Sequence, residues 1–212
     1  MPGGFISRVN DEEQTILVRL FTDVGALISE QGDDDPLPVP TEPSEEDPIA
    51  HLDFEPSDFD DPCAESEEYL ALDPALARVF PPMSLSDPDL AGEMRSLTLG
   101  DLRNNKLQNL RKVVLGLESA TNHVMILENE VDRWLAALTD VRVVLASRLG
   151  IDDESDAERV QELAHVAVTD STPAATDDAE LELALASLYA GLTWWQESLL
   201  SAMSGRGGPN YC

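Results

Sequence analysis

Residues 20–77 contain no lysine or arginine, and this gap limits what the chain can fold into more than any other feature. The segment holds 18 Asp and Glu residues, and 11 of the 14 prolines lie within it or just after it. It cannot bury enough apolar surface to offset the entropy of ordering, and its charges repel one another. We therefore expect residues 31–72 to be a long, acidic, disordered insertion. Phe54 and Phe59 either pin it to its own domain, which we favour, or dock on a partner.

The negative charge is unevenly distributed over the 212 residues. The chain has 13 Lys and Arg against 42 Asp and Glu, a net charge of −29, of which residues 20–77 carry −18. Residues 95–114 reverse the sign, with five basic residues against one acidic residue. A protein this acidic is not coated in phosphate-binding charge and does not adhere to an anionic membrane. We therefore expect most of the surface to avoid nucleic acid, with residues 95–114 as the exception.

Apolar residues recur at three- and four-residue spacing through most of the remaining chain, which is typical of helices packed on a core. The pattern predicts an all-α helical bundle with one minimal β-ribbon, in which Phe5–Val9 can pair with His123–Leu127. The predicted helices are 11–29, 73–80, 86–96, 99–117, 128–149, 154–168 and 180–203. The expected parts are an N-terminal strand and helix (1–30), the acidic linker (31–72), a helical domain (73–204) and a flexible tail (205–212).

Two helices carry unusual residues beside their apolar stripes. In helix 180–203, Trp194 and Glu197 point away from the stripe, and Trp194 is either buried within the chain, which we favour, or contacts another subunit. In helix 99–117, Arg103 and Lys106 lie inside the apolar arc. They either form internal ion pairs, which we favour, or bind an anion. The remaining candidates for a phosphate contact, all outside that arc, are Arg95, Arg111 and Lys112.

Nothing in the sequence indicates catalysis, a metal or a cofactor. No phosphate-binding loop, dinucleotide-binding glycine pattern or nucleophile elbow occurs, and His51, His123 and His165 lack ligand spacing. The acidic residues of the linker are not preorganised for acid–base chemistry. We therefore expect no enzyme activity, no metal site and no cofactor.

The sequence has no stretch long and apolar enough to span a membrane, and its N-terminus lacks the pattern of a secretory signal. We therefore expect a cytoplasmic protein. Cys63 and Cys212 are too few for a disulfide scaffold. On residue chemistry they are either incidental, which we favour, or a redox pair.

Four segments together resemble the actinobacterial oxidative-stress regulator AosR family, formerly filed as a domain of unknown function. The similarity is good over residues 73–203, weak over the N-terminal helix, and leaves out the acidic linker. The segments are Asp73-Pro-Ala-Leu-Ala-Arg-Val-Phe-Pro81, Leu102-Arg-Asn-Asn-Lys-Leu-Gln-Asn109, Trp134-Leu-Ala-Ala-Leu-Thr-Asp-Val-Arg142 continuing to Ser147-Arg-Leu-Gly150, and Leu192-Thr-Trp-Trp-Gln-Glu-Ser-Leu199.

The resemblance implies a dimeric transcription factor that senses oxidants through cysteine disulfide chemistry and binds promoter DNA with a sigma factor. On this chain the switch would fall to Cys63 and Cys212. The motif residues that carry over, with either an interface or a structural role, are Arg103, Lys106, Asn109, Trp134, Asp140, Arg142, Trp194, Gln196 and Glu197.

Our leading prediction is therefore a redox-responsive regulator of oxidative-stress genes, whose disulfide biases a homodimer that binds DNA. The tentative DNA contacts are Arg95, Arg103, Lys106, Arg111 and Lys112. The expected partners are promoter DNA, a sigma factor or RNA polymerase, and a second copy, with no membrane. The rival prediction is an acidic helical interaction or adaptor protein that makes no direct DNA contact.

Overall fold

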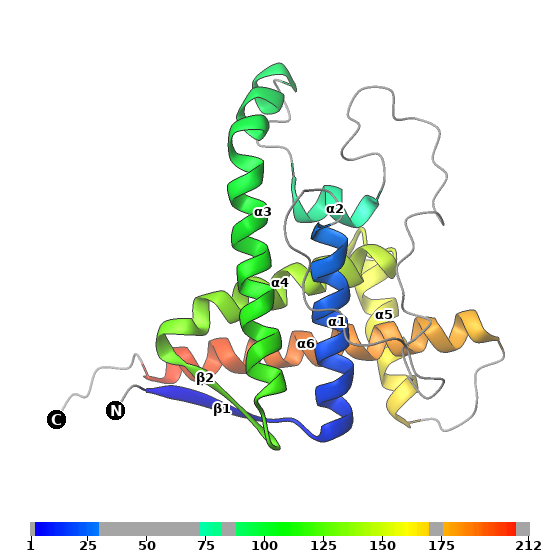
Figure 1. Ribbon diagram of the computed structural model, residues 1–212. Helices are drawn as coiled ribbons and strands as arrows, with labels where there is room; N and C mark the ends of the chain where they lie inside the picture. Colours follow the sequence, from blue (N-terminus) through cyan, green and yellow to red (C-terminus); the bar gives the residue numbers. More distant parts are fainter. Residues whose placement is uncertain (1–2, 30–72, 82–87, 170–175, 207–212) are drawn as a thin grey trace.

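The computed structural model describes residues 3–29, 73–81, 88–169 and 176–206, and the side chains of 88–97, 168 and 206 are not part of that description. The described chain is mostly helical, with one small antiparallel ribbon (Figure 1). The all-α prediction with a minimal ribbon is therefore confirmed. The elements are β1 (Gly4–Arg8), α1 (Asp11–Ser29), α2 (Pro74–Val79), α3 (Pro88–Glu118), β2 (His123–Leu127), the 3₁₀ turn η3 (Glu128–Glu130), α4 (Val131–Arg148), α5 (Glu154–Thr169) and α6 (Asp177–Arg206).

The ribbon consists of the two segments that were predicted to pair from the sequence. β1 and β2 run antiparallel, with Phe5 opposite Ile126 and Ser7 opposite Val124. Val124 and Ile126 are buried against the helices, whereas Met125 is exposed on the other face. This alternation follows from the period of two in a strand, which turns every second side chain towards the core.

The helices form two crossing sets around one core. In Figure 1, α1 and α3 run side by side, and α4 and α6 cross them steeply. Trp134 of α4 and Phe21 of α1 are among the largest fully buried side chains. The Gln14 side chain donates to the carbonyl oxygen of Leu117 at 2.6 Å and so links the start of α1 to the end of α3.

Local signals set several helix ends. At α1, Asn10 Oδ1 accepts from the backbone N–H of Glu13 at 2.8 Å, and Glu13 Oε2 accepts from that of Asn10 at 2.9 Å. This reciprocal capping box satisfies two donors that the helix cannot satisfy itself. Asp73 caps α2, with Pro74 at its first position, as the sequence predicted. Gly150, with φ of 62°, ends α4 in the left-handed conformation that glycine adopts without strain.

The prediction of separate helices over 86–96 and 99–117 is wrong, because α3 is continuous. No proline or helix-capping pair interrupts Ser96-Leu-Thr-Leu99, so the helical hydrogen bonds run through it. Gly100 is exposed, and a helix tolerates a single glycine there at a modest cost. The N-terminal turns of α3 consequently extend beyond the neighbouring helices (Figure 1).

The predicted acidic insertion, residues 31–72, lies outside the described residues, as does the predicted tail from residue 207 onward. Within the described ranges, no helix combines the length and apolarity needed to cross a membrane.

Candidate functional site

The ammonium group of Lys106 makes its contacts inside the protein. Its Nζ lies 2.5 Å from Asp140 Oδ1 on α4 and 5.7 Å from the centre of the Phe80 ring. Arg103, one turn earlier on α3, is buried as well. A charge held in the interior is poorly placed to reach a phosphate, so the structure favours the internal role for both residues.

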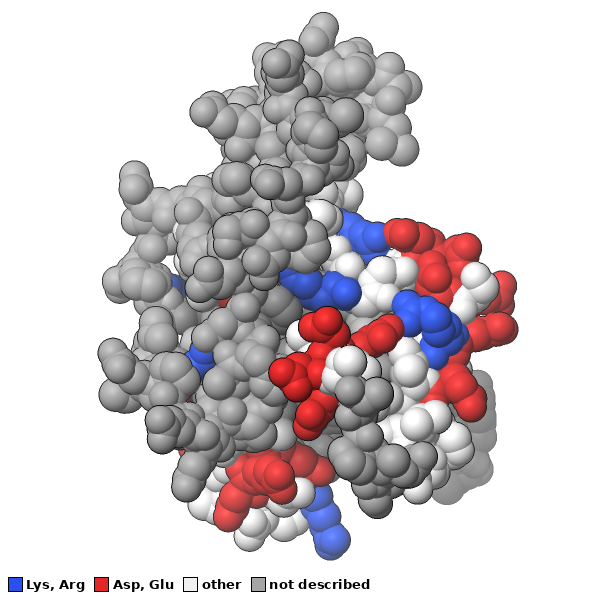
Figure 2. Space-filling view, turned by 90° about the vertical axis from the view of Figure 1, so that its right-hand side faces the viewer, with Lys and Arg blue, Asp and Glu red and all other residues white. Residues whose placement is uncertain are grey.

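Of the other tentative DNA contacts, Arg111 and Lys112 have described side chains. Lys112 Nζ lies 2.6 Å from Glu130 Oε1, and Arg111 is half-buried. Arg95 lies on α3, but its side chain is not described. On the face shown in Figure 2, the described basic side chains are interspersed among acidic ones. On α3 itself, two of the tentative contacts, Lys106 and Lys112, already form ion pairs within the chain.

Several motif residues join α4 to α6. Arg142 donates to Thr193 Oγ1 at 3.0 Å and to Gln196 Oε1 at 2.9 Å, and its guanidinium lies 5.4 Å from the Tyr189 ring centre. The amide of Gln196 donates in turn to Thr139 Oγ1 at 3.0 Å. This network fixes the rotation of α6 about its axis. It therefore gives the motif residues Arg142 and Gln196 a structural role.

The remaining motif residues fall into different environments. Asn109 is buried, and its amide donates to Asn105 Oδ1 on the preceding turn at 3.3 Å. Trp134 is buried in the core, with its ring centre 5.8 Å from that of Trp195 in an edge-on arrangement. Glu197 is exposed on α6. Trp194 is 68% exposed, so the expectation that it is buried within the chain is wrong.

Burial raises the pKa of Asp140 above its ordinary value of 3.8, although Lys106 opposes the shift. Asp140 Oδ2 is buried and accepts no hydrogen bond. Only one of the two carboxylate oxygens therefore has a partner that offsets the loss of water. In the folded state the Asp140 carboxyl group therefore keeps its proton over a pH interval in which the same group of the unfolded chain has already lost it. The contribution of Asp140 to the free energy of unfolding falls as the pH rises through that interval.

Replacing Asp140 by Asn is expected to remove this pH dependence. The variant lacks the titrating carboxyl group. The difference in free energy of unfolding, wild type minus Asp140→Asn, should fall as the pH rises from the ordinary aspartate pKa towards neutrality. Urea denaturation across that range measures it, and a difference that rises with pH would show that the ion pair outweighs burial.

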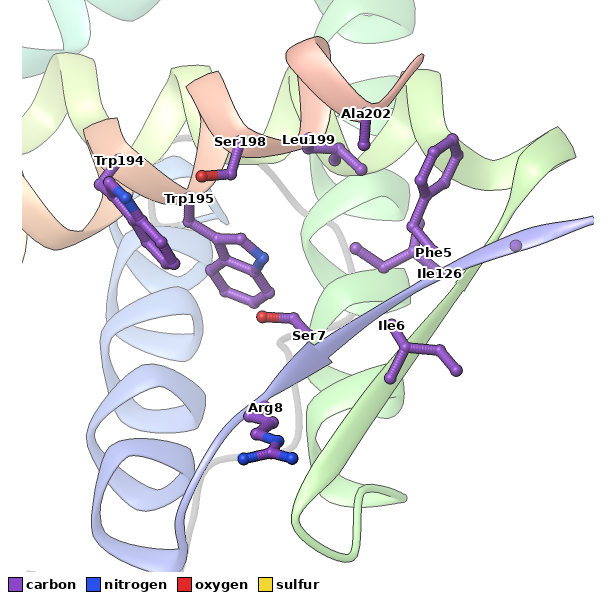
Figure 3. A pocket seen from close by; sticks show the side chains of 11 residues that line it. Phe5, Ile6, Ser7, Arg8, Ile126, Trp194, Trp195, Ser198, Leu199 and Ala202 are labelled. Atoms are coloured by element: carbon purple, nitrogen blue, oxygen red, sulfur yellow. The ribbon is translucent and has the colours of Figure 1, made fainter. Parts of the chain in front are cut away.

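A groove lies between β1 and α6 (Figure 3), and we call it the β1–α6 groove. It encloses a volume of about 580 Å³, which is in the range of peptide and small-molecule pockets. Trp194 and Trp195 extend from α6 towards β1, while Phe5 extends from β1 towards α6. Its lining residues are Gly4, Phe5, Ile6, Ser7, Arg8, Ile126, Trp194, Trp195, Ser198, Leu199 and Ala202.

A second hollow of about 400 Å³ continues the groove towards α1. It shares the two tryptophans, Ser7 and Arg8 with the groove, and its further walls include Ile16 and Gly191. Neighbouring tryptophans thus have opposite environments. Trp195 is fixed against the core, whereas Trp194 stands exposed at the junction of the two hollows.

An exposed tryptophan beside an apolar groove is typical of a protein-binding surface, where aromatic side chains supply most of the binding energy. The sequence indicated only one member of this site, through the position of Trp194 off the apolar stripe. The contribution of β1 was missed, because a five-residue strand carries no signal of what packs beside it.

The redox residues Cys63 and Cys212 both lie outside the described residues. In the part of the chain that the structure describes, no cluster of three or more His, Cys, Asp or Glu side chains could hold a metal ion.

Comparison with known proteins gives one match. A family model described as a domain of unknown function, DUF2017, matches residues 1–203. No curated protein and no solved structure matches. The matched range includes both walls of the β1–α6 groove and the Lys106–Asp140 ion pair.

Proposed function

The chain belongs to the DUF2017 family, and we propose that it is a regulator of oxidative-stress genes that acts by binding a protein of the transcription machinery, a sigma factor or RNA polymerase. The assignment to oxidative-stress regulation rests on the resemblance of four chain segments to the AosR family. The mode of action is argued from the described surface.

The observation that carries the proposal is the exposure of Trp194 beside an apolar groove. An exposed tryptophan costs hydration free energy in the isolated protein, and a partner that covers it recovers that cost. Tryptophan is also the residue type most enriched among those that dominate binding energy at interfaces. The β1–α6 groove is therefore the contact surface in this proposal.

A protein partner is favoured over direct reading of DNA by the state of the basic residues. Lys106 and Lys112 are ion-paired within the chain, and Arg103 is buried. Releasing such cations to bind phosphate would cost the interactions they already make. This combination supports the adaptor-like mode of action, with promoter specificity supplied by the partner.

The redox element of the proposal is that oxidation joins Cys63 and Cys212 and thereby changes partner binding or biases a homodimer. It rests on the resemblance alone. Cys63 has carboxylates nearby in sequence, Asp61 and Glu65. Negative neighbours disfavour the thiolate, so the response should need sustained oxidant.

Replacing Trp194 by Ala is expected to weaken binding to purified sigma factor or RNA polymerase by at least about tenfold, because the variant loses the exposed ring. The matched control is Leu115→Ala, which removes an exposed apolar side chain of α3 outside the groove and should change affinity by less than about twofold. Binding is measured with reduced and peroxide-treated protein, and with both cysteines replaced by Ser.

The same samples are titrated against promoter DNA over a salt series. The proposal expects no salt-dependent DNA shift without the protein partner. A shift by the isolated protein whose affinity falls steeply with salt, unchanged by Trp194→Ala, would instead establish direct phosphate contacts and overturn the protein-mediated mode.

A further inference from the structure

The exposed side of the α6 wall carries small residues before and after Trp194. Ser187 and Gly191 line the second hollow, and Ser198 and Ala202 line the β1–α6 groove. The steps between these five positions are three or four residues, so they share one face of the helix. Figure 3 shows Trp194 and Ser198 on the α6 side of the groove. Another helix can approach this face closely, because Trp194 is its one large side chain.

The two hollows are spaced like side chains on one face of a helix. Gly191 lines only the second hollow, and Ser198 lines only the β1–α6 groove. These residues are seven positions apart, which is about 10 Å along α6. On a bound helix aligned with α6, side chains seven positions apart also share a face and are separated by about 10 Å. Side chains on one face of a strand are about 7 or 14 Å apart, so an extended segment matches the hollows less well.

The length and lining of the combined surface suit about four helical turns. From Ser187 to Ala202 the surface follows α6 for about 22 Å. The opposite wall is apolar as well, with Ile16 and Leu17 in the second hollow and Ile126 in the β1–α6 groove. An amphipathic helix would therefore turn its apolar face into the hollows and its polar face to solvent.

The charges around this surface favour a basic helix. Arg8 is the only cation among the described residues that line either hollow, and its exposed side chain can keep its charge in water. Glu13 lines the second hollow, and Glu197 is exposed one turn after Trp194. Glu197 takes part in none of the ion pairs found in the described chain. The net charge of −29 attracts a basic helix from a distance and makes a second copy the poorer occupant.

We propose that the β1–α6 groove and the second hollow together bind a basic amphipathic helix of a partner protein. The helix packs along α6 and places two apolar side chains, seven positions apart, in the two hollows on either side of Trp194. Glu197 pairs with a lysine or arginine at the edge of the helix, which gives a role to a motif residue that the packing of the chain does not explain. This inference rests on the proposed function and specifies how the partner occupies the same surface.

The probe is a labelled synthetic peptide of about 16 residues, or about four turns, made of leucine and lysine with leucine at the spacing of a helix face. Its twin has the same composition, but leucine and lysine alternate as on a strand. Both peptides carry the same charge, so general attraction to an acidic protein does not distinguish them. By fluorescence anisotropy the helix-patterned peptide should bind at least about tenfold more tightly than its twin.

Gly191→Leu tests the fit of the helix by filling the second hollow. A Cβ on Gly191 meets nothing within 4 Å, and leucine is the better helix former, so the variant should resist urea at least as well as wild type. It should nevertheless bind the helix-patterned peptide at least about tenfold more weakly. Gly100→Leu on α3 is the matched control, because a Cβ there also meets nothing within 4 Å. It should change binding by less than about twofold.

Glu197→Lys tests the charge without filling either hollow. At low ionic strength it should weaken binding of the helix-patterned peptide at least about fivefold, and added salt should reduce the difference. Glu162→Lys on α5 makes the same change in net charge at an exposed position outside both hollows, and it should cost less than about twofold.

Three results would overturn the proposal. The first is equal binding of the two peptides to wild type, and the second is binding that Gly191→Leu leaves unchanged. The third is an equal effect of Glu197→Lys and Glu162→Lys. A concentration-dependent dimer, lost in Gly191→Leu and displaced by the peptide, would also overturn it by assigning the surface to a second copy.

The two proposals can fail separately. If Trp194→Ala abolishes binding of sigma factor or polymerase while Gly191→Leu does not, the protein partner stands and the helical binding mode is overturned. If the helix-patterned peptide binds as expected but no transcription protein does, the helix-binding surface stands and the proposed regulatory function is overturned.

Discussion

Replacing Asp73 by Ala is expected to lower the free energy of unfolding by about 3–5 kcal/mol, because it removes the carboxylate that pairs with the buried Arg148 guanidinium. Asp73 is 3% exposed, and its carboxylate receives Arg148 Nη1 at 3.0 Å and Nη2 at 2.5 Å. The same carboxylate caps α2 by accepting from the backbone N–H of Ala75 at 2.7 Å. One substitution therefore removes the ion pair that fixes α2 to α4 and the cap that starts α2.

The matched control is Arg78→Ala on the same short helix. Arg78 pairs with Asp152 at the surface, where the two side chains are 36% and 74% exposed. Solvent screens such a pair, so this change should cost less than about 1 kcal/mol. Urea denaturation of both variants measures the difference.

A double variant separates the ion pair from the cap. Arg148→Met combined with Asp73→Ala removes both charges, and it should recover part of the loss of Asp73→Ala alone because no charge stays buried without its partner. A loss from Asp73→Ala no greater than that from Arg78→Ala would contradict the assigned role of the buried pair.

The helices and their ends could be predicted where the signal is local. Asp73-Pro74 and Gly150 act through their own backbone and nearest neighbours, and the structure places both where the sequence did. The division of α3 into helices 86–96 and 99–117 was an error of the same local kind, since no residue between Ser96 and Leu99 stops a helix.

The partners of the charged residues could not be predicted. Lys106 meets Asp140 34 positions away, and Asp73 meets Arg148 75 positions away. With 42 acidic residues in the chain, residue type alone cannot select the partner of a cation. The helix face of Lys106 indicated an internal pair, and only the packing of α3 on α4 identifies it.

The candidate site could not be predicted from a sequence motif, because it is formed by the packing of β1 beside α6. Trp194 and Trp195 are adjacent and chemically identical, yet one is exposed and the other is fixed in the core. Their difference follows from helix geometry, which directs Trp195 onto Trp134 of α4 and Trp194 outward. The position of β1 against α6, which forms the groove, has no such signal. No periodicity within a five-residue strand encodes that position.

Replacing Gly116 by Ala is expected to lower the free energy of unfolding by about 1–3 kcal/mol, although alanine is the better helix former. A Cβ at this position of α3 would lie 2.6 Å from Trp134 Cζ2 and 3.2 Å from Cη2. Trp134 is buried and packs on Trp195, so the indole cannot move aside without disturbing the wall of the β1–α6 groove. The overlap should therefore outweigh the gain in helix propensity.

Gly100→Ala on the same helix is the matched control, because a Cβ there meets nothing within 4 Å. It should raise the free energy of unfolding by about 0.5–1 kcal/mol, so the two glycine variants of α3 are expected to change stability in opposite directions. Shortening the ring with Trp134→Phe should make Gly116→Ala less costly than in the wild-type background. If Gly116→Ala proved as stabilising as Gly100→Ala, the contact between α3 and the Trp134 ring would not be as tight as described, and the groove would lose its fixed wall.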